Sequence, residues 1–202
     1  MFGRAFWNII QHMNEDLTEL MSQPTIWKQE ADNLLEMSGI LPIFRKYGEV
    51  NIHGSYALDL MLSSSDIDIY VINPVVNKED AYSALSEILE TKFWNDYRLY
   101  DFVETPKDRF PSGRYIWLEA TVNGHHWDLS ILFVKEFPPE QKRHFEWLLA
   151  NLDDDKRRAI LEIKNARDLK GWDIDSIVIC NAVVKDGIAS VNEFEKAHVA
   201  SS

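Results

Sequence analysis

Two aspartates in the middle of the chain stand at a spacing that suits metal binding. Asp66 and Asp68 are separated by one residue, and apolar residues surround them in the stretch DIDIYVI. In an extended strand this spacing places both carboxylates on one face and Ile67, Ile69 and Val71 on the other. Carboxylates that lie close together raise each other's pKa unless positive charge offsets them. The pattern therefore favours a divalent cation bound to a strand whose opposite face is buried.

A Gly-Ser pair lies upstream of this strand. Gly54 and Ser55 end the stretch NIHGS, which is typical of a short strand that enters a tight turn. Glycine allows a close backbone approach, and serine adds a hydroxyl group and a backbone N–H. We therefore expect this turn to hold phosphate beside the metal site.

A predicted β-hairpin supplies two further acids. Two runs of alternating residues, 114–122 and 125–134, flank an Asn-Gly pair, which is a strong signal for a two-residue turn. This turn places Glu119 directly opposite Asp128, on the polar face of the hairpin. Opposed acids repel each other, and a divalent cation would offset that repulsion. Carboxylate ligands suit Mg²⁺ or Mn²⁺ better than zinc.

Taken together, these residues resemble the nucleotidyltransferase superfamily, which contains DNA polymerase beta. The pattern of that superfamily is an apolar residue, Gly, then Gly or Ser, a spacer, a strand with two acids, and a third acid on a neighbouring strand. All of it is present within residues 45–135. The resemblance implies a small mixed β-sheet backed by helices, and two metal ions, Mg²⁺ or Mn²⁺, bound by Asp66, Asp68 and Asp128.

The expected reaction moves a nucleoside monophosphate from a nucleoside triphosphate to a hydroxyl group and releases pyrophosphate. On this interpretation Asp66 and Asp68 bind metal and nucleotide, and Asp128 binds the metal beside the acceptor hydroxyl. Glu119 is the candidate general base, on the evidence of hairpin register alone. Four basic residues are candidates for binding the triphosphate tail, and the sequence selects none of them: Arg109, Arg114, Lys164 and Arg167.

The charge balance bears on the acceptor. The chain has 33 acidic and 21 basic residues, a formal net charge of −12. Nucleic-acid backbones favour clustered Lys and Arg, so this balance argues against a nucleic-acid partner and favours a small-molecule or protein acceptor. Two alternatives stay open: a nucleotidyltransferase that modifies nucleic-acid ends, and a non-catalytic module that binds nucleotides or a partner.

Around the site the sequence predicts an α+β fold with N-terminal helices and a helical C-terminal region. Apolar residues at helical spacing predict one helix over residues 4–21 and a second over 25–37, with Pro24 at the start of the second. The predicted division is N-terminal helices over 1–45, the nucleotidyltransferase core over 46–135 and C-terminal helices over 136–202, all within one compact unit.

The composition is typical of a cytoplasmic protein. The single cysteine, Cys180, excludes an internal disulfide and fits a reducing compartment. Polar residues interrupt the first apolar residues, and no apolar run approaches the ~20 residues of a membrane span. We therefore expect no signal peptide and no membrane contact.

Overall fold

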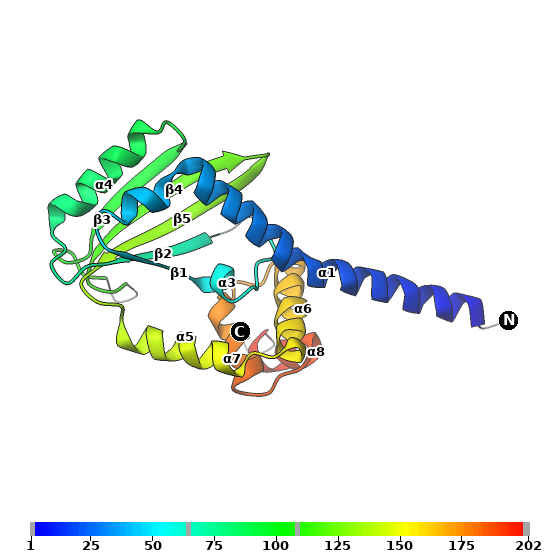
Figure 1. Cartoon of the computed structure of the whole chain (residues 1–202). Coiled ribbons are helices and arrows are strands. Elements are labelled where there is room, and N and C mark those ends of the chain that lie inside the picture. Colours follow the sequence, from blue (N-terminus) through cyan, green and yellow to red (C-terminus); the bar gives the residue numbers. More distant parts are fainter. Residues whose placement is uncertain (1–2, 64–65, 108–109, 200–202) are drawn as a thin grey trace.

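A five-stranded mixed sheet forms the centre of the computed structural model, which describes residues 3–63, 66–107 and 110–199 (Figure 1). The strands are β1 (Glu49–His53), β2 (Asp66–Ile72), β3 (Asp96–Asp101), β4 (Arg114–Val122) and β5 (His125–Val134). Their order across the sheet is β1-β2-β5-β4-β3. β2 and β5 run parallel, and the other neighbours are antiparallel. The predicted α+β fold, a small mixed sheet backed by helices, is confirmed.

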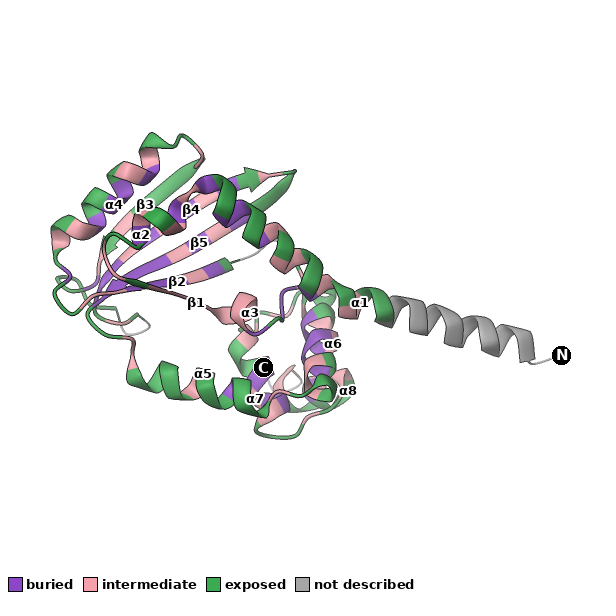
Figure 2. Cartoon of the chain, viewed as in Figure 1, coloured by how far each residue is buried: buried purple, intermediate pink, exposed green. Residues whose placement is uncertain are grey.

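Helices surround this sheet on two sides. Those that precede β5 are α1 (Gly3–Ser38), α2 (Ile40–Phe44), α3 (Gly54–Ala57) and α4 (Lys78–Glu90). Those that follow it are α5 (Pro139–Asn151), α6 (Asp154–Lys170), α7 (Ser176–Val184) and α8 (Val191–Phe194), then a π-helical turn over Glu195–Val199. Figures 1 and 2 together show α1, α2 and α4 on one side of the sheet and α5 to α8 gathered on the other. In the described part of the chain, no helix has the length and apolar character that crossing a membrane requires.

The hairpin forms with the predicted register. Asn123 and Gly124 both have positive φ, 52° and 81°, as a two-residue turn between twisted strands requires. The pairing places Glu119 opposite Asp128. The hairpin therefore sets the position of these two acids relative to each other.

Two main hydrophobic cores hold the fold together. The first lies between the sheet and helices α1, α2 and α4, where Ile67, Ile69 and Val71 are fully buried, as β2 alternation predicts. Figure 2 shows this burial along β2 and β5. The second core lies among α6, α7 and α8 and includes Leu58 and Leu60, which follow the Gly-Ser turn. The turn and the C-terminal helices are therefore packed together.

The predicted break between two N-terminal helices is wrong, because α1 continues through Pro24. A proline inside a helix costs a hydrogen bond and adds a steric clash. Here packing on both sides offsets that cost: Leu20 before the proline contacts the second core, and Trp27 and Ala31 after it contact the first. The helix ends only before Gly39, which has a φ of 62°.

Candidate active site

Acidic side chains from four strands line up across one face of the sheet. Asp66 pairs with Asp128 between β2 and β5, Glu119 pairs with Asp128 across the hairpin, and Asp96 pairs with Glu119 between β3 and β4. Paired residues project to the same face. We call Asp66, Asp128, Glu119 and Asp96 the acid row. Asp68, on the same strand as Asp66 and on the same face, stands beside the acid row.

Gly54 contacts the second aspartate of the strand. It begins α3 with a φ of 69°, which non-glycine residues rarely adopt. A Cβ at this position would collide with Oδ2 of Asp68. The fold therefore brings the predicted Gly-Ser turn against the predicted two-acid strand.

The carboxylates of β2 are poorly compensated by the protein itself. Burial and the neighbouring Asp66 raise the pKa of Asp68 to about 6. Burial and the charge of Asp128 also raise the pKa of Asp66. Oδ1 of Asp128 is buried and accepts no hydrogen bond from any described residue. These residues fit a divalent cation, because a cation would supply both the missing ligand and the missing charge.

A histidine that the sequence analysis did not select lies among these acids. Nε2 of His126 is 3.3 Å from Oδ1 of Asp128, and its Nδ1 is 3.7 Å from Oε1 of Glu119. The three side chains offer ligand atoms that all lie within 4.8 Å of one another. The sequence signal was strand alternation, since His126 precedes Asp128 by two residues and so shares its face. An imidazole nitrogen is therefore available as a metal ligand beside the carboxylates.

Lys164 of α6 reaches the Gly-Ser turn from the C-terminal helices. Its Nζ donates hydrogen bonds to Oγ of Ser55, at 3.1 Å, and to the carbonyl oxygen of Leu60, at 2.6 Å. The residue is only 5% exposed, and burial lowers its pKa to about 8. The sequence signal was its position on the apolar stripe of the helix, one turn after the buried Ile160 and Leu161.

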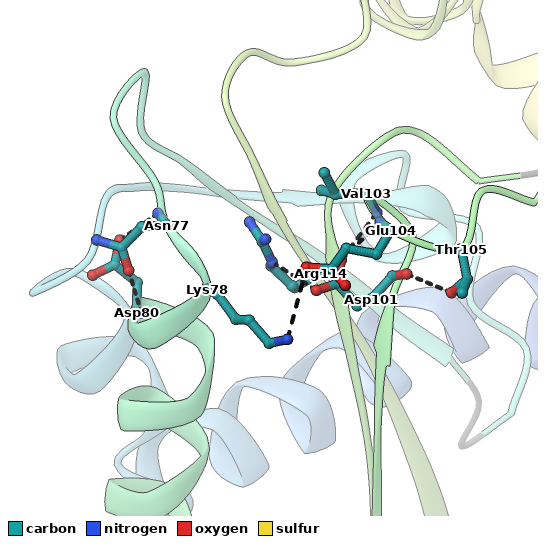
Figure 3. Close-up of polar contacts among 8 residues, drawn as sticks. All are labelled: Asn77, Lys78, Asp80, Asp101, Val103, Glu104, Thr105 and Arg114. Atoms are coloured by element: carbon teal, nitrogen blue, oxygen red, sulfur yellow. Dashed lines mark hydrogen bonds and ion pairs between the residues drawn. The ribbon is translucent and has the colours of Figure 1, made fainter.

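The other basic candidates differ in position. Arg167 lies one helical turn after Lys164, and its Nη1 donates to Oγ of Ser176 at 2.9 Å. Arg114 lies on the opposite face of the sheet from the acids, where its Nε is 3.5 Å from Oδ2 of Asp101 (Figure 3). Arg109 lies outside the described residues. Lys164 and Arg167 are therefore the two sequence candidates that the structure brings to the site.

A cavity of about 480 Å³ connects these groups. Its lining includes Gly54, Ser55, Asp66, Asp68, Lys164 and Arg167. Asp66 and Asp68 come from β2, and Lys164 and Arg167 come from α6, where Arg167 is paired with Asp168 at 2.8 Å. This volume falls within the usual range for small-ligand sites, and the charge pattern suits a polyphosphate bound together with a metal ion.

The comparisons with known proteins agree with this geometry. The nucleotidyltransferase domain family matches residues 37–147, which is more than half of the 202-residue chain. The matched segment contains the Gly-Ser turn and the whole acid row, and it ends before α6. No curated protein matches the chain significantly.

Solved structures with the same fold have low sequence identity to the chain. A cytoplasmic RNA terminal U-transferase has a TM-score of 0.58 at 17% identity, over 86% of this chain and 53% of its own. The Cid1 poly(U) polymerase has the same TM-score and identity, over 85% of this chain and 55% of its own. The GLD-2/RNP-8 complex has a TM-score of 0.56 at 17% identity, over 94% of this chain and 63% of the matched chain.

Identities at this level establish a shared fold and no more. The chain spans about half the length of the first two of these structures. The family match instead covers residues 37–147 of the chain, a segment that contains the turn and the acids described above. The chain therefore belongs to the nucleotidyltransferase domain family.

Proposed function

We propose that the protein is a divalent-metal-dependent enzyme that transfers a nucleoside monophosphate from a nucleoside triphosphate to a hydroxyl at the end of a nucleic acid. The observation that carries this proposal is the strand register, which gathers Asp66, Asp68 and Asp128 on one face beside the Gly-Ser turn. Uncompensated acids that are brought together repel one another, so their convergence favours a bound cation over a purely structural role.

The three aspartates are the proposed metal ligands. Asp66 and Asp68 bind metal together with the nucleotide, and Asp128 binds metal beside the acceptor hydroxyl. A divalent cation bound there neutralises phosphate charge and lowers the pKa of a bound hydroxyl group. His126 lies near both Asp128 and Glu119 and offers a ring nitrogen as a further ligand atom.

The triphosphate tail occupies the cavity between the turn and α6. Ser55 donates its backbone N–H and its hydroxyl, and Lys164 is already hydrogen bonded to that hydroxyl. Arg167 lines the same cavity and is paired there with Asp168, so its guanidinium contributes hydrogen-bond donors more than net charge. Charge-assisted hydrogen bonds of this kind hold phosphate oxygens in a fixed orientation.

The chemical step is an in-line displacement at the α-phosphorus. The acceptor hydroxyl oxygen forms a bond to this phosphorus, the bond to the β-phosphate oxygen breaks, and pyrophosphate leaves. Glu119, next to Asp128 in the acid row, is the proposed base that takes the hydroxyl proton. A positioned base typically contributes ~10²–10⁴-fold to such a rate.

The proposed acceptor is a nucleic acid and not the small molecule or protein predicted from net charge. Solved structures with this fold are described as an RNA terminal U-transferase and a poly(U) polymerase, which favours the nucleic-acid alternative. Net charge is a weak guide here, because it sums over the whole chain and does not give the local charge of the surface that an acceptor contacts.

Thermal shift and pyrophosphate release test the proposal. Each of the four ribonucleoside triphosphates is added with Mg²⁺ or Mn²⁺, and at least one is expected to raise the melting temperature only when metal is present. Pyrophosphate release with an oligonucleotide acceptor is expected to disappear in Asp128→Asn and to persist in the exposed control Asp186→Asn. The proposal fails if no triphosphate protects the protein in either metal, or if Asp128→Asn retains full turnover.

A further inference from the structure

The acid row is one of three parallel rows on the same face of the sheet. Strand pairing defines them: residues that are paired across β2, β5, β4 and β3 form each row. The second row holds Asp68, Ser130, Trp117 and Arg98, and the third holds Tyr70, Leu132, Tyr115 and Tyr100. Metal-binding side chains therefore continue directly into aromatic and basic side chains.

The half of this face on β4 and β3 is open. Tyr70 and Leu132, on the other half, are buried in a small cluster with Phe137. Arg98, by contrast, is exposed, and Tyr100 is 36% exposed. Trp117 and Tyr115 are half-buried. Aromatic rings that reach solvent next to one another on a sheet face are typical of a binding surface.

Cations are already placed against these rings. The guanidinium carbon of Arg98 lies 4.8 Å from the ring centroid of Trp117. Nζ of Lys107 lies 5.5 Å from the ring centroid of Tyr100. Tyr100 in turn stacks on Tyr115, with a centroid distance of 5.9 Å. The surface thus presents planar rings with positive charge beside them.

The aromatic surface is joined to the catalytic end by direct contacts. The hydroxyl of Tyr115 lies 2.9 Å from Oγ of Ser130, which is two residues from Asp128 on β5. Trp117 is the diagonal cross-strand neighbour of Asp128, at a typical distance of ~7–8 Å in a sheet. A chain whose terminal hydroxyl reaches Asp128 can therefore pass over Trp117 next.

We propose that Trp117, Arg98, Tyr100 and Lys107 form a platform that binds the single-stranded end segment of the acceptor nucleic acid. Bases stack on the two rings, and the two cations contact the phosphates. Stacking on aromatic side chains is tolerant of sequence, and it requires bases that are not paired in a duplex. A duplex would bring its phosphates to a face with five acids and few cations, so charge disfavours it. This proposal rests on the proposed nucleic-acid acceptor and names where that acceptor lies.

Fluorescence anisotropy with labelled oligonucleotides tests the platform. The probes are single-stranded RNA and single-stranded DNA of roughly 10 nucleotides, and an RNA duplex of equal length, all with Mg²⁺ and without nucleoside triphosphate. We expect a single strand to bind more tightly than the duplex. Trp117→Ala and Arg98→Ala are each expected to weaken binding by at least about 5-fold. The matched control is Tyr97→Ala. Tyr97 lies on β3 next to Arg98 and is 48% exposed, but its side chain is on the opposite face of the sheet.

Arg98→Ala guards against misfolding, because Arg98 is an exposed side chain whose removal leaves the core intact; melting curves accompany every variant. Unchanged binding in both Trp117→Ala and Arg98→Ala overturns the platform, as does equal binding of the duplex. The arms with RNA and DNA decide which sugar the platform accepts. Protection by nucleoside triphosphate is measured without any oligonucleotide, so the two proposals can fail separately. If no triphosphate protects the protein but the oligonucleotide binds as expected, the proposed function fails and the platform stands. If a triphosphate protects the protein but Trp117→Ala and Arg98→Ala bind the oligonucleotide normally, the platform alone fails.

Discussion

Gly54 shows how one residue couples the turn to the acids. Replacing it with alanine forces a side chain into positive φ, at a cost of about 1–2 kcal/mol, and also pushes against the carboxylate of Asp68. We expect Gly54→Ala to lower the melting temperature and to abolish metal-dependent protection by nucleoside triphosphate.

A second glycine separates the two effects of that substitution. Gly171 has a φ of 66°, close to that of Gly54, but a Cβ there would meet no atom within 4 Å. Gly171→Ala is therefore expected to cost similar stability and to keep nucleotide protection. Equal loss of protection in both variants would show that backbone strain alone explains the effect and that Asp68 is not involved.

The raised pKa of Asp68 leads to a second prediction, which concerns how the stability of the protein depends on pH. Its folded-state pKa of about 6 exceeds that of an unfolded aspartate, so the stability it contributes is present below about pH 4 and is lost as pH rises through 6. Asp68→Asn removes the buried charge. We expect the metal-free variant to be more stable than the parent at pH 7 by on the order of 2 kcal/mol, or several degrees in melting temperature.

The same variant is expected to lose the response to metal. Mg²⁺ with nucleoside triphosphate should stabilise the parent protein at pH 7 and leave Asp68→Asn unchanged, because the variant has lost a proposed ligand. Asp186→Asn, in an exposed loop, is the control for both measurements. If the metal-free melting temperatures of parent and Asp68→Asn coincide at pH 7, the carboxylate is better compensated than its surroundings indicate.

At the scale of elements, the sequence predicted correctly those features that depend on neighbouring residues alone. The hairpin register follows from one Asn-Gly turn, and the alternation of β2 sets which residues face the core, so Glu119, Asp128 and Asp66 could be placed on polar faces from sequence. The parallel pairing of β2 with β5 joins strands that are far apart in the chain, and no local signal specifies it. The family resemblance supplied that step.

Other elements escaped prediction for physical reasons. The helix α1 continues through Pro24 because the residues before the proline pack against one core and those after it against the other. Local helix propensity does not include such distant contacts. The sequence could not select Lys164 from the four basic candidates, because its contact with Ser55 depends on how α6 packs against the turn. Each failure concerns tertiary packing that overrides a local preference.

Lys164 makes the prediction at this scale. Burial lowers its pKa to about 8, so in the free protein the ammonium group is present below pH 8 and is lost above it. A bound triphosphate favours the charged form, so binding above pH 8 requires proton uptake. We expect nucleotide affinity to fall as pH rises from 7 to about 9, by up to tenfold per pH unit.

Lys164→Met tests the origin of this pH dependence. The variant keeps a long apolar side chain in the buried position and removes the charge. It is expected to bind nucleoside triphosphate more weakly by at least about tenfold and to show a flat profile over the same pH range. Calorimetric titration measures both, and the exposed Lys185→Met is the control. A falling profile that survives in Lys164→Met would assign the titration to another group.

At the scale of the whole molecule, each of the two hydrophobic cores positions a different part of the site. The first core holds the sheet and hence the acids, whereas the second holds α6 and hence Lys164 and Arg167. Both must be docked for the cavity between them to exist. The same substitution in each core distinguishes these contributions, because Ile88 of α4 and Ile160 of α6 are both fully buried.

Ile88→Ala and Ile160→Ala are each expected to lower the free energy of unfolding by about 2–4 kcal/mol, through lost burial and a residual cavity. Nucleotide affinity of the folded protein should differ between them. Ile160→Ala loosens the helix that positions Lys164, so its dissociation constant for triphosphate is expected to rise, whereas Ile88→Ala leaves that helix in place. Calorimetry well below both melting temperatures decides the matter. Equal dissociation constants would mean that the cations reach the triphosphate independently of how tightly α6 packs, and that the C-terminal helices serve stability alone.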